Sequence, residues 1–192
     1  MKMLIKAAAL PLATIPSFSF SSPTSDEEVK IYNVLINHGL GPTSETVVIA
    51  SQTTGDPIGI GLQEGKIELI NELGATKETL FDWQNKNKTR VPIEVALTLT
   101  VSYQVLNERE RESIFNSKDP HVGWQNFFAY YENTSGLLRL SRVGFDLEQK
   151  NALVYVEYQC GAACGSGRLI HLIKSNGADW TVNNATLMWM AD

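Results

Sequence analysis

The clearest alternation of hydrophobic and polar positions lies in the segment VPIEVALTLTVSYQV, residues 91–105. Apolar side chains from Ile93 to Val105 alternate with polar or small side chains from Glu94 to Gln104. A period of two places successive side chains on opposite faces of an extended chain. The segment therefore predicts one long strand with a buried face and a solvated face.

Further segments with strand character follow one another after Gly136. They are LLRLSRVGF, ALVYVEYQ, RLIHLIKS and WTVNNATLMWM, at residues 137–145, 152–159, 168–175 and 180–190. The connections between them are short, and the last one carries an Asn-Gly pair, which is typical of hairpin turns. Because short connections favour antiparallel pairing, these segments predict a β-meander.

Helical patterns lie mostly before these strands. Ser25 and Glu28 have the spacing of a capping box, and an apolar stripe with helical spacing follows them. Two weaker helical segments, residues 66–73 and 77–87, come after a predicted strand at residues 45–53.

Two more helices are predicted before the meander. Asn107 and Glu110 indicate a short capped helix, and Asp119-Pro120 opens another helix with proline at its first position. Aromatic side chains of this second helix recur at i, i+3, i+4 and i+7, which predicts one face packed against a sheet. These aromatic residues are Trp124, Phe127, Phe128 and Tyr131.

Helices followed by a meander predict an α+β fold, in which N-terminal helices pack on a curved antiparallel sheet that ends in a C-terminal β-meander. The chain of 192 residues is long enough for one domain with a substantial core. We place this single domain at residues 26–192, after a linker-like SSPTS segment.

The first residues have the pattern of a targeting segment. Lys2 and Lys6 precede a short apolar run at residues 7–15, and small residues follow that run. The pattern resembles a signal peptide at residues 1–22 and predicts a secreted protein, periplasmic or extracellular; the alternative is a disordered apolar tail. No later stretch reaches transmembrane length, so no integral membrane segment is expected after removal of the signal.

The composition excludes several classes of partner. The formal net charge is -5, from 16 Lys and Arg against 21 Asp and Glu, whereas binding of nucleic acid needs clustered basic residues. No G-x-G-x-x-G or Walker pattern is present, so no nucleotide cofactor is predicted. An unidentified small molecule or protein remains as the expected partner.

Both cysteines lie between two predicted strands, in the segment VEYQCGAACGSGRLI, residues 156–170. Zinc sites commonly use paired C-x-x-C units, and thioredoxin-like pairs lie at a helix N-terminus, so neither pattern fits Cys160 and Cys164. A structural disulfide that closes the loop is favoured, with unpaired thiols and redox or metal chemistry as alternatives. Gly165 and Gly167 indicate a turn with positive φ, or alternatively an anion-binding nest of backbone amides.

His171 is the most interesting of the three histidines. If the hairpin turns about Cys164, Glu157 lies opposite His171 on one sheet face, with Tyr155 beside them. These three side chains are candidates to line the concave side of a curved sheet and bind a ligand. The alternative is a surface contact between strands. The opposite face then holds an apolar core, formed by Val154, Val156, Tyr158, Ile170 and Leu172.

Arg142 lies inside a predicted strand, which is an unusual place for a charged side chain. Its guanidinium group is a candidate to bind an anionic ligand through its planar fork of donors. The alternative, which we favour, is an ion pair with a neighbouring carboxylate.

The order of features from Trp124 onward forms a signature over about a third of the chain. It consists of W-x-x-F at residues 124–127, a tyrosine pair at 130–131, a TSG turn, SRVGF at 141–145, ALVYV at 152–156, the Cys-Gly loop at 160–167 and a Trp-containing last strand. This order resembles that of a group of uncharacterised secreted bacterial proteins. The resemblance implies an extracytoplasmic domain and transfers no catalytic residue. The layout also resembles nuclear-transport-factor and cystatin-like cone folds, a likeness of fold that does not give function.

The leading hypothesis is a non-catalytic module that binds a small molecule or a protein on the concave sheet face or its rim. No catalytic residue, metal site or cofactor is assigned. The alternative is a hydrolase-like or isomerase-like enzyme that uses His171 with Glu157 or Asp146 in a cone-shaped pocket. Thiol-disulfide chemistry at Cys160 and Cys164 ranks last. The location of the His171 ring, in a pocket or on a wet surface, distinguishes the first two hypotheses.

Overall fold

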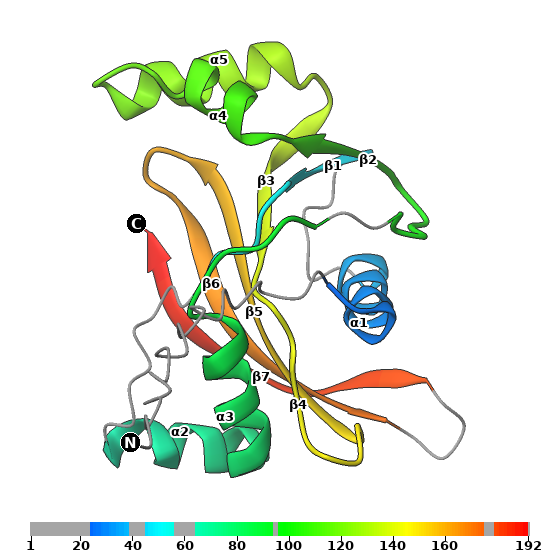
Figure 1. Cartoon of the computed structure of the whole chain (residues 1–192). Coiled ribbons are helices and arrows are strands. Elements are labelled where there is room, and N and C mark those ends of the chain that lie inside the picture. Colours follow the sequence, from blue (N-terminus) through cyan, green and yellow to red (C-terminus); the bar gives the residue numbers. More distant parts are fainter. Residues whose placement is uncertain (1–23, 39–44, 56–63, 94–95, 175–178, 192) are drawn as a thin grey trace, which may run out of the picture.

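A mixed sheet of seven strands runs through the described part of the molecule, with helices on both of its faces (Figure 1). The computed structural model describes residues 24–38, 45–55, 64–93, 96–174 and 179–191. The predicted signal peptide, residues 1–22, and the Asn-Gly pair at 176–177 lie outside these described residues. The helices and the sheet together make an α+β fold, as predicted.

The helices are α1 (Asp26–Asn37), α2 (Glu64–Leu73), α3 (Lys77–Lys86), α4 (Glu108–Ile114) and α5 (Pro120–Tyr130). The strands are β1 (Thr46–Ala50), β2 (Ser102–Leu106), β3 (Thr134–Leu140), β4 (Gly144–Phe145), β5 (Asn151–Gly161), β6 (Cys164–Lys174) and β7 (Trp180–Ala191). The order in the sheet is β2-β1-β3-β5-β6-β7, and β4 pairs with β5. Both predicted capping boxes are present, at the start of α1 and at the start of α4.

The prediction of a wholly antiparallel sheet was wrong on its N-terminal side. Strand β1 pairs in parallel with both β2 and β3. The connection from β1 to β2 passes through α2 and α3, and a crossover of this length returns the chain in its original direction. The antiparallel meander of β5, β6 and β7 is confirmed.

The alternating segment at residues 91–105 forms a strand only at its C-terminal end, in β2. Upstream of β2, its backbone is bound by α1. The N–H group of Thr98 donates to Asn33 Oδ1 at 2.9 Å. The N–H group of Thr100 donates to Asn37 Oδ1 at 2.8 Å. Asparagine side chains of a helix thus replace a neighbouring strand, which is why the period of two did not produce a long strand here.

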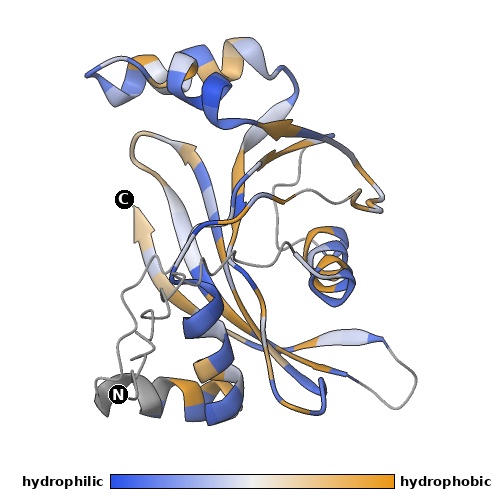
Figure 2. Ribbon diagram, in the orientation of Figure 1, coloured by the Kyte–Doolittle hydropathy of each residue, from blue (hydrophilic) through white to orange (hydrophobic). Residues whose placement is uncertain are grey.

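Hydrophobic residues run along the strands of the sheet (Figure 2), and their side chains form apolar clusters on its two faces. The first face packs against α1 and forms the largest apolar cluster, which includes Ile31, Leu35, Leu138, Leu140, Val154, Val156, Ile170 and Leu172. The second face carries two smaller clusters. One lies under α2 and α3 and includes Leu73, Trp83, Leu153, Tyr155 and Leu169. The other lies under α4 and α5 and includes Val48, Leu106, Trp124, Phe127, Tyr131 and Leu137.

Gly165 and Gly167 lie within strand β6, where neither has a positive φ. The predictions of a turn and of an anion nest at these glycines were therefore both wrong. They make room instead for the indole of Trp189 in β7. A Cβ atom at Gly167 would overlap both the hydroxyl of Tyr155 and the ring of Trp189.

We expect Gly167→Ala to lower the free energy of unfolding by about 1–3 kcal/mol, because the added methyl group overpacks this contact. Urea denaturation followed by tryptophan fluorescence measures the change. Gly161→Ala is the control, because a Cβ atom there lies 3.4 Å from the Cβ atom of Cys164, an ordinary contact. Equal losses in the two variants would contradict the steric explanation.

Candidate functional site

The ring of His171 is buried, with 1% of the residue exposed. Its Nδ1 atom lies 3.0 Å from the carbonyl oxygen of Leu73 and 3.1 Å from Nδ2 of Asn183. Its Nε2 atom lies 3.1 Å from Oδ1 of Asn151. The ring therefore connects the end of α2 to strands β5 and β7. The ring lies neither in an open pocket, as the enzyme hypothesis required, nor on a wet surface, as the binding hypothesis required. It is a hydrogen-bonded part of the interior.

The predicted pairing of Glu157 with His171 was wrong. Strand register places Leu153 opposite His171, and Gly167 opposite Glu157. The hairpin turns before Cys164 and not about it, so the pairing differs from the predicted one by four residues. Because four is an even number, every side chain keeps its predicted face. The apolar face with Val154, Val156, Ile170 and Leu172 is confirmed.

Asp146, the other carboxylate considered for His171, reaches the ring through Asn151. Asn151 Nδ2 donates to Asp146 Oδ2 at 2.6 Å, which turns the Oδ1 atom of Asn151 toward the imidazole. Burial lowers the pKa of His171, against the opposing effects of the Leu73 carbonyl and the charge of Asp146. The folded protein therefore favours a neutral ring.

A fall in stability from pH 7 to pH 5.5 should follow from this lowered pKa. The neutral His171 ring contributes fully to stability above pH 6.5, the ordinary pKa of histidine. This contribution is lost as the pH falls toward the lower pKa of the folded protein, because His171 takes up a proton at a higher pH in the unfolded chain than in the folded one. Denaturation at a series of pH values should show this loss in the wild type and not in His171→Gln. His121→Gln, at an exposed position, is the control and should retain it. Identical profiles for all three proteins would contradict the assignment.

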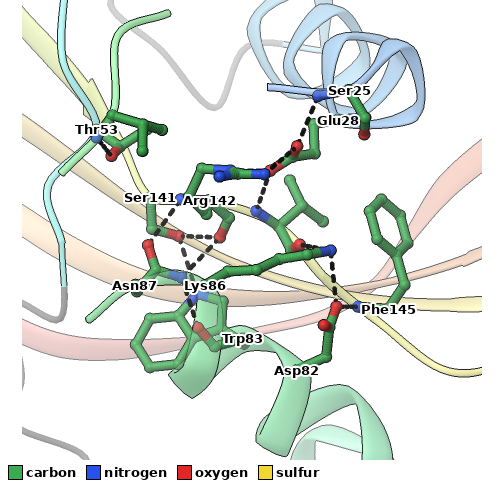
Figure 3. Close-up of polar contacts among 12 residues, drawn as sticks. Ser25, Glu28, Thr53, Asp82, Trp83, Lys86, Asn87, Ser141, Arg142 and Phe145 are labelled. Atoms are coloured by element: carbon green, nitrogen blue, oxygen red, sulfur yellow. Dashed lines mark hydrogen bonds and ion pairs between the residues drawn. The ribbon is translucent and has the colours of Figure 1, made fainter. Parts of the chain in front are cut away.

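Arg142 lies in a buried ion pair with Glu28 of α1 (Figure 3). Its Nε donates to Glu28 Oε1 at 2.7 Å, and its Nη2 donates to Glu28 Oε2 at 3.0 Å. The carboxylate also accepts from the backbone N–H groups of Ser25 and Val143. Burial raises the pKa of Glu28, but these hydrogen bonds outweigh it, so the net direction is downward. The favoured ion-pair alternative for Arg142 is thus the one observed.

The residues around Arg142 attach the bend between β3 and β4 to α3. The side chain of Asn87 accepts from the N–H group of Arg142 and donates to its carbonyl oxygen. The indole of Trp83 donates to the hydroxyl of Ser141 at 2.9 Å. A Cβ atom at Gly144 would overlap Trp83. The SRVGF segment of the sequence signature therefore has a structural role in this chain.

We expect Glu28→Gln to lower the free energy of unfolding by about 3–5 kcal/mol, because it leaves the buried charge of Arg142 uncompensated. Glu112→Gln, at an exposed position of α4, should change it by less than about 0.5 kcal/mol. Thermal and urea denaturation measure both effects. A similar small loss in both variants would show that the ion pair does not hold the fold together.

A cavity of about 330 Å³ lies on the second face of the sheet, beside α4 and α5. Among the described residues, its lining includes three arginines and no carboxylate. The lining residues are Arg90, Arg111, Phe115, Trp124, Leu137, Arg139 and Gln159, and we call the cavity they form the arginine pocket. Arg90 follows α3, Arg111 belongs to α4, and Arg139 belongs to β3, so three elements converge here.

Two of these arginines also hold carboxylates at the edge of the pocket. Arg139 Nη1 lies 3.0 Å from Glu157 Oε1, an oxygen that also accepts from Gln159 at 2.6 Å. Arg111 Nη2 lies 3.1 Å from Glu108 Oε2. The candidate Glu157 thus belongs to the border of the pocket.

Arg90 is exposed and forms no ion pair with another residue in the described ranges. A guanidinium group has five N–H donors in a planar fork. The pairs made by Arg111 and Arg139 use only some of these donors, so all three side chains retain capacity to bind an anion.

Tyr155, the remaining candidate, is buried beneath Trp189. The indole N–H of Trp189 donates to the hydroxyl of Tyr155 at 2.5 Å. Burial raises the pKa of Tyr155 to about 12. The neutral phenol belongs to the packing under α2 and α3, and it places Trp189 against the glycines of β6.

A second cavity, of about 490 Å³, lies between α3 and the β4–β5 loop. Its lining includes three carboxylates, Glu78, Asp82 and Asp146, and two of them are engaged within the fold. Asp82 accepts from Lys86 and from the N–H group of Phe145. Asp146 accepts from Asn151 and from backbone N–H groups of its own loop. These contacts stabilise the loop.

The predicted disulfide between Cys160 and Cys164 is present and closes the hairpin between β5 and β6. The two Cα atoms are 5.0 Å apart. Among the described residues, no three of His, Cys, Asp and Glu come together as ligands for a metal ion. None of the helices in the described ranges has the length and apolar character needed to cross a bilayer.

Comparison of the chain with models of protein families, with curated proteins and with solved structures finds no match.

The arginine pocket was not predicted from the sequence. Its cationic residues come from three separate segments and share no local motif. The one available signal was Arg139, a charged residue three positions before Arg142 in an otherwise apolar strand. The three sequence candidates Tyr155, Glu157 and His171 were predicted on the correct sheet face, but they do not form the pocket.

Proposed function

We propose that this protein is a non-catalytic, extracytoplasmic module that binds a small organic anion in the arginine pocket. The observation that carries the proposal is that three arginines line one cavity, and that none of its lining residues within the described ranges is a carboxylate. Hydrogen bonds from guanidinium groups to anionic oxygens are among the strongest in proteins. The cavity volume also lies at the lower end of the range for small-molecule sites.

The three arginines of the pocket are unusual because the chain as a whole is acidic. The chain carries a formal net charge of -5, so its basic residues are in the minority. Like charges held close together are unfavourable unless anions compensate them. Glu108 and Glu157 compensate Arg111 and Arg139, and a bound anion would compensate Arg90.

The extracytoplasmic location rests on two supports. The disulfide between Cys160 and Cys164 is of a kind that persists mainly in oxidising compartments. The N-terminal pattern of basic, apolar and small residues is typical of a secretory signal. The enzyme hypothesis has less support, because polar groups of the fold face both ring nitrogens of the buried His171: the acceptor Asn151 Oδ1 faces Nε2, and the donor Asn183 Nδ2 faces Nδ1.

Anion binding by the full chain should depend on Arg90. In thermal-shift and calorimetric titrations with a panel of small carboxylates and inorganic phosphate, we expect at least one anion to bind and to raise the melting temperature. Arg90→Gln should weaken that binding about ten-fold or more, because it removes a charge-assisted hydrogen bond.

Arg109→Gln is the matched control. Arg109 is an exposed arginine of α4, close in sequence to Arg111 but outside the pocket lining, so its loss should leave binding unchanged. If no anion in the panel binds, or if both variants weaken binding equally, the proposed function fails.

A further inference from the structure

We infer that the ligand of the arginine pocket is an aromatic monocarboxylate. This inference rests on the proposed function and specifies the chemical class of the anion. It combines three features of the pocket: its charge balance, the geometry of its donors and the aromatic side chains of its wall.

The charge balance indicates a monoanion. Three guanidinium groups surround the pocket, and two carboxylates, Glu108 and Glu157, pair with Arg111 and Arg139 at its edge. One positive charge therefore remains for the ligand, and Arg90 is the arginine without a carboxylate partner among the described residues. A dianion would need to displace a carboxylate, and the Glu157 side chain is only 7% exposed and is held by two donors.

The donors favour a carboxylate group over a spherical ion. A guanidinium group presents parallel N–H donors that match the two oxygens of a carboxylate. Arg90 and Arg111 approach the pocket from different elements and retain unused donors. They are suited to bind the two oxygens of one planar carboxylate group.

The wall of the pocket favours an aromatic ring. Phe115 and Trp124 meet edge to face with their ring centroids 5.3 Å apart, and Leu137 lies beside them in the lining. Gly123 permits this packing, because a Cβ atom there would lie only 2.7 Å from Cδ1 of Phe115. A flat ligand ring can extend this aromatic arrangement, whereas an aliphatic ring lacks the complementary quadrupole.

The experiment uses calorimetric titration of the full chain with four probes: benzoate, cyclohexanecarboxylate, phthalate and inorganic phosphate. Benzoate and cyclohexanecarboxylate differ in aromaticity at similar size, and phthalate adds a second carboxylate to the ring. We expect benzoate to bind about three-fold to ten-fold more tightly than cyclohexanecarboxylate, the range that an aromatic contact provides. Benzoate should also bind more tightly than phthalate and phosphate.

Two variants test separately the contact with the aromatic ring of the ligand and the contact with its carboxylate. Phe115→Leu should weaken benzoate binding more than cyclohexanecarboxylate binding, and so remove the preference for benzoate. Phe128→Leu is its control, because Phe128 packs on Trp124 but does not line the pocket. Arg90→Gln should weaken benzoate and cyclohexanecarboxylate by the same factor.

The results distinguish a failure of the proposed ligand class from a failure of the proposed function. If phosphate or phthalate binds more tightly than benzoate and still depends on Arg90, the aromatic monocarboxylate is overturned and anion binding stands. Equal binding of benzoate and cyclohexanecarboxylate also overturns the aromatic class alone. If none of the four probes binds, or if binding does not depend on Arg90, both the ligand class and the proposed function fail.

Discussion

The ion pair between Glu28 and Arg142 is the interaction on which the rest of the structure depends. It connects the first helix to a strand end 114 residues later in the chain. A buried pair of charges is tolerated only where hydrogen bonds satisfy both groups, and here backbone donors complete the carboxylate. Arg142 lies in the bend between β3 and β4, and the same bend contacts Trp83 of α3 and Asn87, so it joins helices of both faces to the sheet.

The position of Arg139 follows from this constraint. Arg139 lies three positions before Arg142, and strand alternation turns it to the second face, while Leu138 and Leu140 enter the core of the first face. Its direct partner across the ladder is Glu157. An anchored strand end thus sets the register that brings one arginine of the pocket beside its carboxylate.

Sequence reasoning succeeded where the determinants are local. Capping boxes, the faces of β5 and β6, the meander and the disulfide all depend on residues close together in the chain. It failed where segments distant in the sequence determine the structure. Helix α1 binds the backbone of Thr98 and Thr100, and a long crossover makes β1 parallel to its neighbours. The register of the β5–β6 hairpin also depends on an irregularity between Gln159 and Gly161, which alternation alone does not reveal.

The polar groups of this chain differ in whether the fold supplies all of their partners. The ring of His171 and the carboxylate of Glu28 each find partners within the fold. Around the arginine pocket the match is incomplete, because three guanidinium groups meet two carboxylates. An unmatched cation beside an aromatic wall contributes little to folding free energy and much to the affinity for an anion. Among the described residues, this surplus charge is the basis of the proposed anion binding.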